Sequence, residues 1–318
     1  MNILVCQPVT EEMKSFFTAQ FPNQDFAYSE TPTTEQFAEA EVIFGYPEPA
    51  MMKYAKKLRF LQLASAGAEK HNSPDIVPLN VPVCCSTGIF GREIGEVLLA
   101  DLLALYKHLH IYRDRQRAHN WAFYDFNRPV SGSRVLILGL GDIGMGFAGL
   151  LKPFGCTVIG VRRTAGKCPD NVNEVYTMEA LDGLLPHADI VAMCLPDTPA
   201  TRGIMTRERI YKIKEGAVLL NVGRGNALDT LALADAVREG HLSGAAIDVV
   251  DTEPLPPEHP IWDVQNIIVT PHTAGRSFSP YIVHHTGEIF VKNLTAFLEG
   301  KPLLTPVDRA TGYMKSRG

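Results

Sequence analysis

The sequence lacks several patterns that would place the protein in another class. Its six cysteines form no CxxC motif and no Cys/His spacing, and most lie in apolar runs. We therefore expect reduced, buried thiols and no metal centre. No apolar run reaches the roughly 18 residues that span a bilayer, because Asp101 and Lys107 interrupt the best candidate. The start, MNILVCQPV, has no basic segment or cleavage site of a signal peptide, so we expect a cytoplasmic protein.

Excess charge, internal repeats and low-complexity segments are missing too. The formal net charge is -5 and the pI is near 6.1. This balance argues against a nucleic-acid or anionic-membrane binder and is typical of an ordinary soluble protein. A chain of 318 residues is long enough for two domains.

What the sequence does contain is an alternation of short apolar runs and helical patterns, which predicts an α/β fold of two Rossmann-like domains. Residues 1–100 and 285–318 are expected to form a smaller, discontinuous, flavodoxin-like substrate domain. Residues 101–284 are expected to form a doubly wound, parallel-sheet dinucleotide-binding domain. The predicted strands are MNILVCQ, EVIFGYP, RFLQLAS and VPVCCST in the first domain, and RVLILG, TVIGVR, DIVAMCLP, AVLLNVG, GAAIDVV and NIIVTPH in the second.

Three other segments have clear patterns. A long helix is predicted from about Arg92 to Arg117, followed by the aromatic segment HNWAFYDFNRPV around Trp121. This segment is either a linker or a surface that packs on a partner subunit. The last helix, about Tyr281–Leu298, is expected to return and pack on the first domain.

A glycine-rich stretch, GLGDIG, directly follows the predicted strand RVLIL and opens a helix. Gly139 would allow the tight turn, Gly141 the approach of a pyrophosphate, and Gly144 close packing of helix on strand. Free N–H groups at the helix start, at Asp142 and Ile143, would face the phosphates. The alternative is an ordinary glycine turn, but the strand before it and the helix after it favour a dinucleotide site.

The next strand ends in VRRT, where enzymes that prefer NAD usually carry an acid. Arg162, Arg163 and Thr164 instead offer donors to a 2'-phosphate. They could also be exposed residues that only aid solubility. The missing acid and the paired arginines both favour NADP(H) over NAD(H).

Polar residues suited to keto-acid reduction follow the last three predicted strands: Arg224, Asp248, Glu253 and His272. Arginine can hold a carboxylate with two hydrogen bonds, and histidine can protonate a carbonyl oxygen as hydride arrives. A glutamate hydrogen-bonded to that histidine would stabilise its protonated ring. Taken singly, Arg224, Asp248 and His272 are better explained as a surface turn residue, a strand cap and a loop residue; taken jointly, at these spacings, they favour a catalytic set.

Four motifs in order, LPDTPAT, NVGRG, DVVDTEPLP and PHTAG, resemble those of the D-isomer-specific 2-hydroxyacid dehydrogenases. The spacings also agree: 24 residues from Arg224 to Asp248, 5 to Glu253 and 19 to His272. The resemblance covers nearly the whole chain. It implies that Arg224 binds the keto acid, that His272 is the acid/base with Glu253 as its partner, and that Asp248 lies beside the nicotinamide. Further cofactor contacts are expected from Leu195, Pro196, Thr201, Val222 and Gly223.

The same resemblance points to a substrate turn in the first domain. Backbone amides at Ser65, Ala66 and Gly67, in LASAGAEKH, would hold the substrate carboxylate, and Ala68 stands in place of the family's common Asp. Arg276, four residues after His272, is either a second substrate contact or a surface residue, and the sequence favours neither.

The ending PLLTPVDRATGY and the GRS after His272 resemble the glyoxylate/hydroxypyruvate reductase branch. The expected activity is therefore NADPH-dependent reduction of a small 2-keto acid to the D-2-hydroxy acid by a homodimer. Two alternatives remain: a 3-phosphoglycerate dehydrogenase-like enzyme, and a non-catalytic dinucleotide sensor like the related corepressors.

Overall fold

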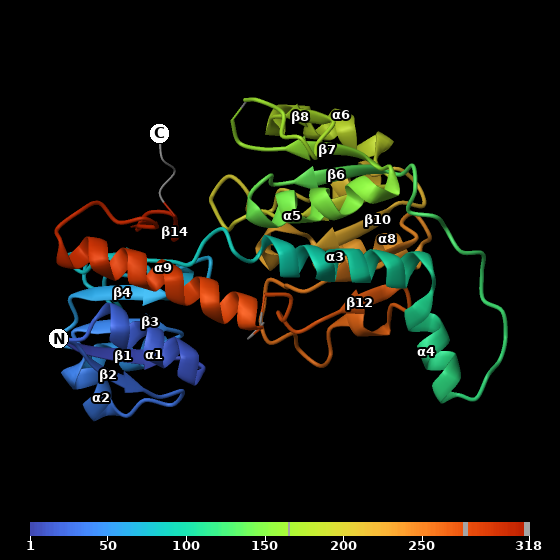
Figure 1. Ribbon diagram of the computed structural model, residues 1–318. Helices are drawn as coiled ribbons and strands as arrows, with labels where there is room; N and C mark the ends of the chain where they lie inside the picture. Colours follow the sequence, from blue (N-terminus) through green and yellow to red (C-terminus); the bar gives the residue numbers. More distant parts are fainter. Residues whose placement is uncertain (165, 276–278, 315–318) are drawn as a thin grey trace. The chain divides into compact units, whose positions relative to one another are not determined.

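The computed structural model describes residues 1–164, 166–275 and 279–314, and the chain divides into two compact units (Figure 1). The first unit comprises Met1–Phe90 and Phe278–Gly318, and the second comprises Gly91–Ser277. The expected boundaries, after residues 100 and 284, would each cut a helix. A helix packs as one rod, so the chain divides next to its helices and not within them.

The first unit is built on a parallel sheet with the strand order β2-β1-β3-β4-β5, which is the flavodoxin-like order. Its strands are β1 Asn2–Cys6, β2 Asp25–Tyr28, β3 Val42–Gly45, β4 Phe60–Leu63 and β5 Val83–Cys84. Its helices are α1 Glu11–Gln20, α2 Thr34–Glu39 and α9 Pro280–Leu298, and its C-terminal hairpin pairs β13 Val307–Asp308 with β14 Tyr313–Met314. Strand β2 was not predicted, because this half-exposed edge strand of four residues has little apolar pattern.

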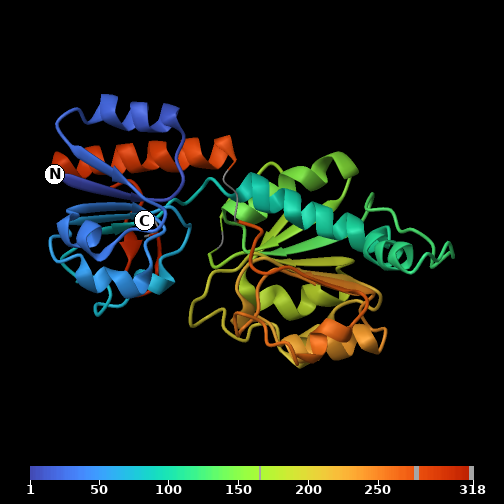
Figure 2. The ribbon, with the colours of Figure 1, turned by 90° about the horizontal axis from the view of Figure 1, so that it is seen from below.

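The two faces of this sheet are buried by different helices, since side chains alternate along a strand. Val5 packs with Phe17 of α1 and Phe290 of α9, whereas Leu4 packs with Phe37 of α2. Helices α1 and α9 lie side by side on one face (Figure 2). The prediction that the last helix packs on the first domain is thus confirmed.

The second unit contains a seven-stranded parallel sheet with the order β12-β11-β10-β9-β6-β7-β8. Its strands are β6 Arg134–Leu138, β7 Thr157–Val161, β8 Glu174–Tyr176, β9 Ile190–Met193, β10 Val218–Asn221, β11 Gly244–Ile247 and β12 Ile267–Val269. Its helices are α3 Gly91–Tyr106, α4 Leu109–Arg117, α5 Asp142–Leu151, α6 Leu181–Leu184, α7 Arg207–Lys212 and α8 Thr230–Arg238. Counted from β6, this is the doubly wound dinucleotide-binding order with a seventh strand at one edge.

Two predictions for this unit were wrong. The single helix from Arg92 to Arg117 is in fact α3 and α4, because His108 between them has a left-handed backbone (φ 53°) that a continuous helix does not allow. Strand β8 was missed because it is a partly exposed edge strand of three residues.

The topology places every predicted motif of the second unit at one edge of the sheet. The chain reverses its direction of winding between β6 and β9, which are neighbours in the sheet. The glycine loop follows β6, and the other motifs follow β7, β9, β10, β11 and β12. Since all strands are parallel, these loops share the carboxyl edge, where ligands bind in such folds.

Candidate active site

The glycine loop has the local geometry that each of its glycines was expected to provide. Gly139 has φ 98°, and a Cβ there would lie 2.6 Å from the carbonyl oxygen of Cys194. A Cβ on Gly144 would collide with the carbonyl oxygen of Gly139, whereas one on Gly141 would meet no atom within 4 Å. Gly141 also provides no side-chain cap for α5. The open space and the uncapped helix start suit a phosphate group.

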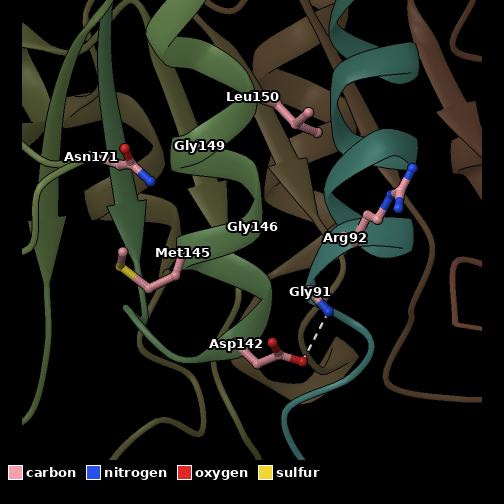
Figure 3. A pocket seen from close by; sticks show the side chains of 8 residues that line it. All are labelled: Gly91, Arg92, Asp142, Met145, Gly146, Gly149, Leu150 and Asn171. Carbon is pink, nitrogen blue, oxygen red and sulfur yellow. Dashed lines mark hydrogen bonds between the residues drawn. The ribbon is translucent and has the colours of Figure 1, made fainter. Parts of the chain in front are cut away.

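Asp142 was expected to contact the cofactor, but its side chain contacts another part of the protein. Its carboxylate accepts a hydrogen bond from the backbone N–H of Gly91 at 2.8 Å (Figure 3). Gly91 is the first residue of α3, and a Cβ on Gly146 of α5 would collide with its backbone. Asp142 therefore stabilises the start of α3 where that helix crosses α5, and only its backbone remains for the phosphates.

Among the described residues, no carboxylate pairs with the two arginines after β7. Arg162 donates from Nη2 to the carbonyl oxygen of Lys167 at 3.0 Å, and Arg163 and Thr164 are exposed. Within residues 1–164, 166–275 and 279–314, neither arginine forms an ion pair. This end of β7 is consequently cationic.

The loops after β9 and β10 touch one another. A Cβ on Gly223 would lie 2.7 Å from the backbone nitrogen of Leu195, so residues 195–196 and 222–223 form one backbone surface. Thr201 donates to the carbonyl oxygen of Pro196 at 2.6 Å and accepts from the backbone N–H of Thr198 at 2.9 Å. Its hydroxyl is thus used to shape the LPDTPAT turn.

His272 and Glu253 form the hydrogen-bonded pair that the sequence predicts. Nδ1 of His272 lies 2.7 Å from Oε2 of Glu253, and both side chains are partly exposed. The other carboxylate oxygen accepts from the backbone N–H of Val250 at 3.3 Å, which fixes the orientation of Glu253. Nε2 of His272 has no hydrogen-bond partner among the described residues, an arrangement that suits a proton donor.

Asp248 is buried and holds the loop that carries His272. Its Oδ1 accepts from the hydroxyl of Thr270 at 2.5 Å and from the backbone N–H of Thr273 at 2.8 Å. Its Oδ2 accepts from the backbone N–H of Ala274 at 2.9 Å. His272 itself has φ 53° and donates its N–H to the carbonyl oxygen of Asp248 at 2.8 Å. Asp248, which the sequence places beside the nicotinamide as an expectation, thus also has a structural role, because it holds the loop of His272.

The electrostatic effect of Asp248 extends to α3. Burial and, to a smaller extent, the charge of Asp248 together raise the pKa of Asp101 to about 6. Asp101 of α3 therefore lies near enough to Asp248 for the two carboxyl groups to interact.

Arg224 follows β10 in a loop with little room for change. The side chain of Asn221 accepts from the N–H of Gly223 at 3.0 Å and donates to the carbonyl oxygen of Arg224 at 3.3 Å. A side chain at Gly225 would collide with the backbone of Val250. Strands β10, β11 and β12 are parallel neighbours in the sheet. The residues that follow them, Arg224, Asp248 and His272, therefore lie at the same edge.

The turn after β4 in the first unit has two available donors. Ser65 donates from Oγ to the carbonyl oxygen of Gly67 at 2.6 Å, and the N–H of Ala68 is bound by the carbonyl oxygen of Gly312 at 2.8 Å. Within the described part of the chain, the N–H groups of Ala66 and Gly67 donate to no acceptor. Successive free amides of this kind can hold an anion.

An acid lies next to this turn although Ala68 takes the place of the family's common Asp. The carboxylate of Glu69 lies against Gly67, so closely that a Cβ on that glycine would collide with it. The acid is simply one residue beyond Ala68, and Tyr313 donates a hydrogen bond to it. No sequence motif indicates this contact across 244 residues. Arg276 lies outside the described residues.

Among the residues that the structure places, no helix is long and apolar enough to cross a membrane. The same residues contain no group of three or more His, Cys, Asp or Glu side chains that could hold a metal ion.

Comparison with known families agrees with this geometry. Residues 99–274, more than half of the chain, match the model of the D-isomer specific 2-hydroxyacid dehydrogenase, NAD binding domain. The chain belongs to this family. The resemblance seen in the motifs is thereby confirmed, and so is the α/β fold class.

Relatives with known names or structures extend the match beyond that domain. A glyoxylate reductase of Thermofilum pendens is 29% identical over 79% of this chain and 75% of its own length. A family protein of Aeromonas salmonicida has a solved structure with TM-score 0.86 and 31% identity, covering 97% of this chain and 99% of that one. An NADPH-dependent glyoxylate/hydroxypyruvate reductase of Sinorhizobium meliloti, solved with NADP and sulfate, has TM-score 0.80 and 25% identity, covering 98% and 99%.

Proposed function

We propose that this dehydrogenase reduces small 2-keto acids of the glyoxylate and hydroxypyruvate type to D-2-hydroxy acids, with NADPH as the preferred cofactor. The observation that carries the proposal is the 2.7 Å hydrogen bond between Nδ1 of His272 and Glu253, at the sheet edge that also bears Arg224 and the glycine loop. The names of two relatives, a glyoxylate reductase and an NADPH-dependent glyoxylate/hydroxypyruvate reductase, support the substrate class.

The proposed chemistry divides between three side chains. Arg224 binds the carboxylate and polarises the carbonyl of the keto acid. His272, protonated at Nε2, donates a proton to the carbonyl oxygen, while Glu253 orients the ring and stabilises its positive charge. Bound NADPH would supply the hydride. The free N–H groups of Ala66 and Gly67 are proposed to bind the carboxylate of the substrate.

The cofactor would be held by the glycine loop and by the loops after β7, β9 and β10. The uncapped start of α5, with Gly141, Ile143 and Gly144, suits the pyrophosphate. Leu195, Pro196, Val222 and Gly223 form the adjoining backbone surface. Arg162, Arg163 and Thr164 would surround the 2'-phosphate.

The proposed activity is tested by following NADPH absorbance with a panel of keto acids. Glyoxylate and hydroxypyruvate are expected to give turnover above that of longer keto acids, and 3-phosphoglycerate with NADP+ or NAD+ is expected to give none. Turnover of 3-phosphoglycerate alone would favour the phosphoglycerate enzyme. A protein that binds NADPH but turns over no keto or hydroxy acid would instead be a dinucleotide sensor.

The cofactor preference depends on the arginines after β7. Arg162→Asp is expected to lower kcat/KM for NADPH by about 10- to 100-fold, because it replaces charge-assisted hydrogen bonds by repulsion. The value for NADH should stay level or rise. Steady-state kinetics with both cofactors measures this, and Arg117→Asp, at the exposed end of α4, serves as the control. Equal use of both cofactors by the wild type would contradict the assignment.

We further propose that the aromatic segment after α4 joins two copies of the chain. Arg115 donates to the carbonyl oxygens of Ala122 and Phe123 at 2.9 and 2.8 Å, so the segment is held in place. The side chains of Trp121 and Phe126 are nevertheless exposed, which is costly for apolar groups in a monomer. Light scattering after gel filtration should report a mass of about twice 35.0 kDa, and a monomer at micromolar concentration would rule out this interface.

A further inference from the structure

The two N–H groups proposed to bind the substrate carboxylate belong to peptide units whose carbonyls are both occupied. In a trans peptide unit, as here, the C=O and the N–H point in opposite directions. The carbonyl oxygen of Ser65 accepts from the backbone N–H of Ser86 at 2.8 Å, and the carbonyl oxygen of Ala66 accepts from the hydroxyl of Thr87 at 3.4 Å. The N–H groups of Ala66 and Gly67 therefore each point away from the group that holds the carbonyl.

The peptide unit between Ala66 and Gly67 is the more easily rotated of the two. Its rotation exchanges N–H for C=O and changes φ of Gly67, and a glycine accepts φ of either sign. A rotated unit would present a carbonyl oxygen to the substrate carboxylate, which repels it, in place of a donor. Among the described residues, no donor other than the hydroxyl of Thr87 reaches the carbonyl of Ala66. This one hydrogen bond thus opposes the rotation.

Thr87 follows a segment that is fixed to the strand before the turn. Ser86 is buried, donates from Oγ to the carbonyl oxygen of Leu63 at 2.9 Å and accepts from Nε2 of Gln62 at 3.4 Å. Gln62 in turn accepts from Nδ2 of Asn293, in α9, at 2.9 Å. Because this buried network joins the end of β4 to the residues after β5, the position of Thr87 relative to the turn is defined.

A neighbouring thiol leaves the hydroxyl proton of Thr87 available for the turn. Sγ of Cys85 lies 3.1 Å from Oγ1 of Thr87. Burial raises the pKa of the Cys85 thiol, so the thiol keeps its proton and can donate it to Oγ1. The hydroxyl then donates its own proton to the carbonyl oxygen of Ala66.

We propose that Thr87 is a positioning residue, whose hydroxyl holds the Ala66–Gly67 peptide unit with its N–H, and not its C=O, toward the substrate carboxylate. The inference rests on the proposed function of that turn. A hydrogen bond to the carbonyl also polarises the N–H of the same unit, which strengthens that donor. The effect of Thr87 is therefore on the affinity for the keto acid, whereas the proton and the hydride come from other groups.

The test compares Thr87→Val, which has nearly the same shape without the hydroxyl, with Thr87→Ser, which keeps the hydroxyl. With saturating NADPH, Thr87→Val is expected to raise the KM for glyoxylate or hydroxypyruvate about fivefold. The kcat and the KM for NADPH should stay within about twofold of the wild-type values. Thr87→Ser should restore a KM close to that of the wild type. The dissociation constant of oxamate, an unreactive carboxylate, should follow the KM in both variants.

A matched control lies in the same unit. Thr286 of α9 is buried, and its hydroxyl donates to the carbonyl oxygen of Ile282, within the same helix, at 2.9 Å. Thr286→Val makes the same substitution and should lower the free energy of unfolding by an amount similar to Thr87→Val, as measured by urea unfolding. It should leave the KM for the keto acid and the dissociation constant of oxamate unchanged.

The outcomes separate the two proposals. A wild type that turns over keto acids, with Thr87→Val leaving the KM within about twofold, would overturn the role of Thr87. The same conclusion would follow if Thr87→Ser or Thr286→Val raised the KM as much as Thr87→Val, or if Thr87→Val lowered kcat at an unchanged KM. A wild type that neither turns over keto acids nor binds oxamate would overturn the proposed function instead.

Discussion

Replacing His272 by Asn is expected to lower kcat for keto-acid reduction by about 10²- to 10⁴-fold, because the proton donor is lost. Asn is the better substitute than Ala, since His272 has φ 53° and Asn tolerates the left-handed backbone. The loop held by Asp248 should therefore keep its shape, and the KM for NADPH should remain within about twofold of the wild-type value. Steady-state kinetics with saturating NADPH measures both quantities.

His259→Ala is the control for this prediction. Nδ1 of His259 accepts a hydrogen bond from the backbone N–H of Ile261 at 3.2 Å, and among the described residues His259 forms no hydrogen bond with His272 or Glu253. The variant should lose some stability and keep its kcat. If His272→Asn retained more than about a tenth of the wild-type kcat, another group would have to donate the proton.

Asp248→Asn is expected to reduce both activity and stability. An amide has one oxygen, so at least one of the three donors at Thr270, Thr273 and Ala274 would face an NH₂ group. Losing a buried acceptor costs about 1–3 kcal/mol in the free energy of unfolding. The loop carrying His272 would shift, and a displacement of about 1 Å can lower kcat by about 100-fold. Urea unfolding and steady-state kinetics measure the two effects.

Asp189→Asn is the control that separates the loss of stability from the loss of activity. Asp189 precedes β9 at the opposite edge of the sheet, where its Oδ2 accepts from the backbone N–H of Arg134 at 2.8 Å and its Oδ1 pairs with Lys214 at 2.5 Å. Its replacement should lower stability by a similar amount and leave kcat unchanged. Equal loss of kcat in both variants would show that Asp248 acts on stability alone.

The sequence predicted the parts of the site that local chemistry dictates. The three glycines of GLGDIG follow a strand and open a helix, and the structure shows the turn, the open space and the close packing that those positions require. The resemblance of DVVDTEPLP and PHTAG to the family motifs implied that Glu253 is the partner of His272, and the two side chains are hydrogen-bonded. Short, half-exposed edge strands such as β2 and β8 were missed, because their apolar pattern is too weak to detect.

What the sequence by itself determined is the fold class, the family and the residue types available for hydride and proton transfer, since these depend on periodicity and on motifs within one loop. The tertiary structure alone decided what the carboxylates do. Asp142 stabilises the start of α3, Asp248 holds the loop of His272, and Glu69 meets Tyr313. The partners of these carboxylates lie 22 to 244 residues away along the chain. The fold brings such distant segments together, and no local pattern records the contacts.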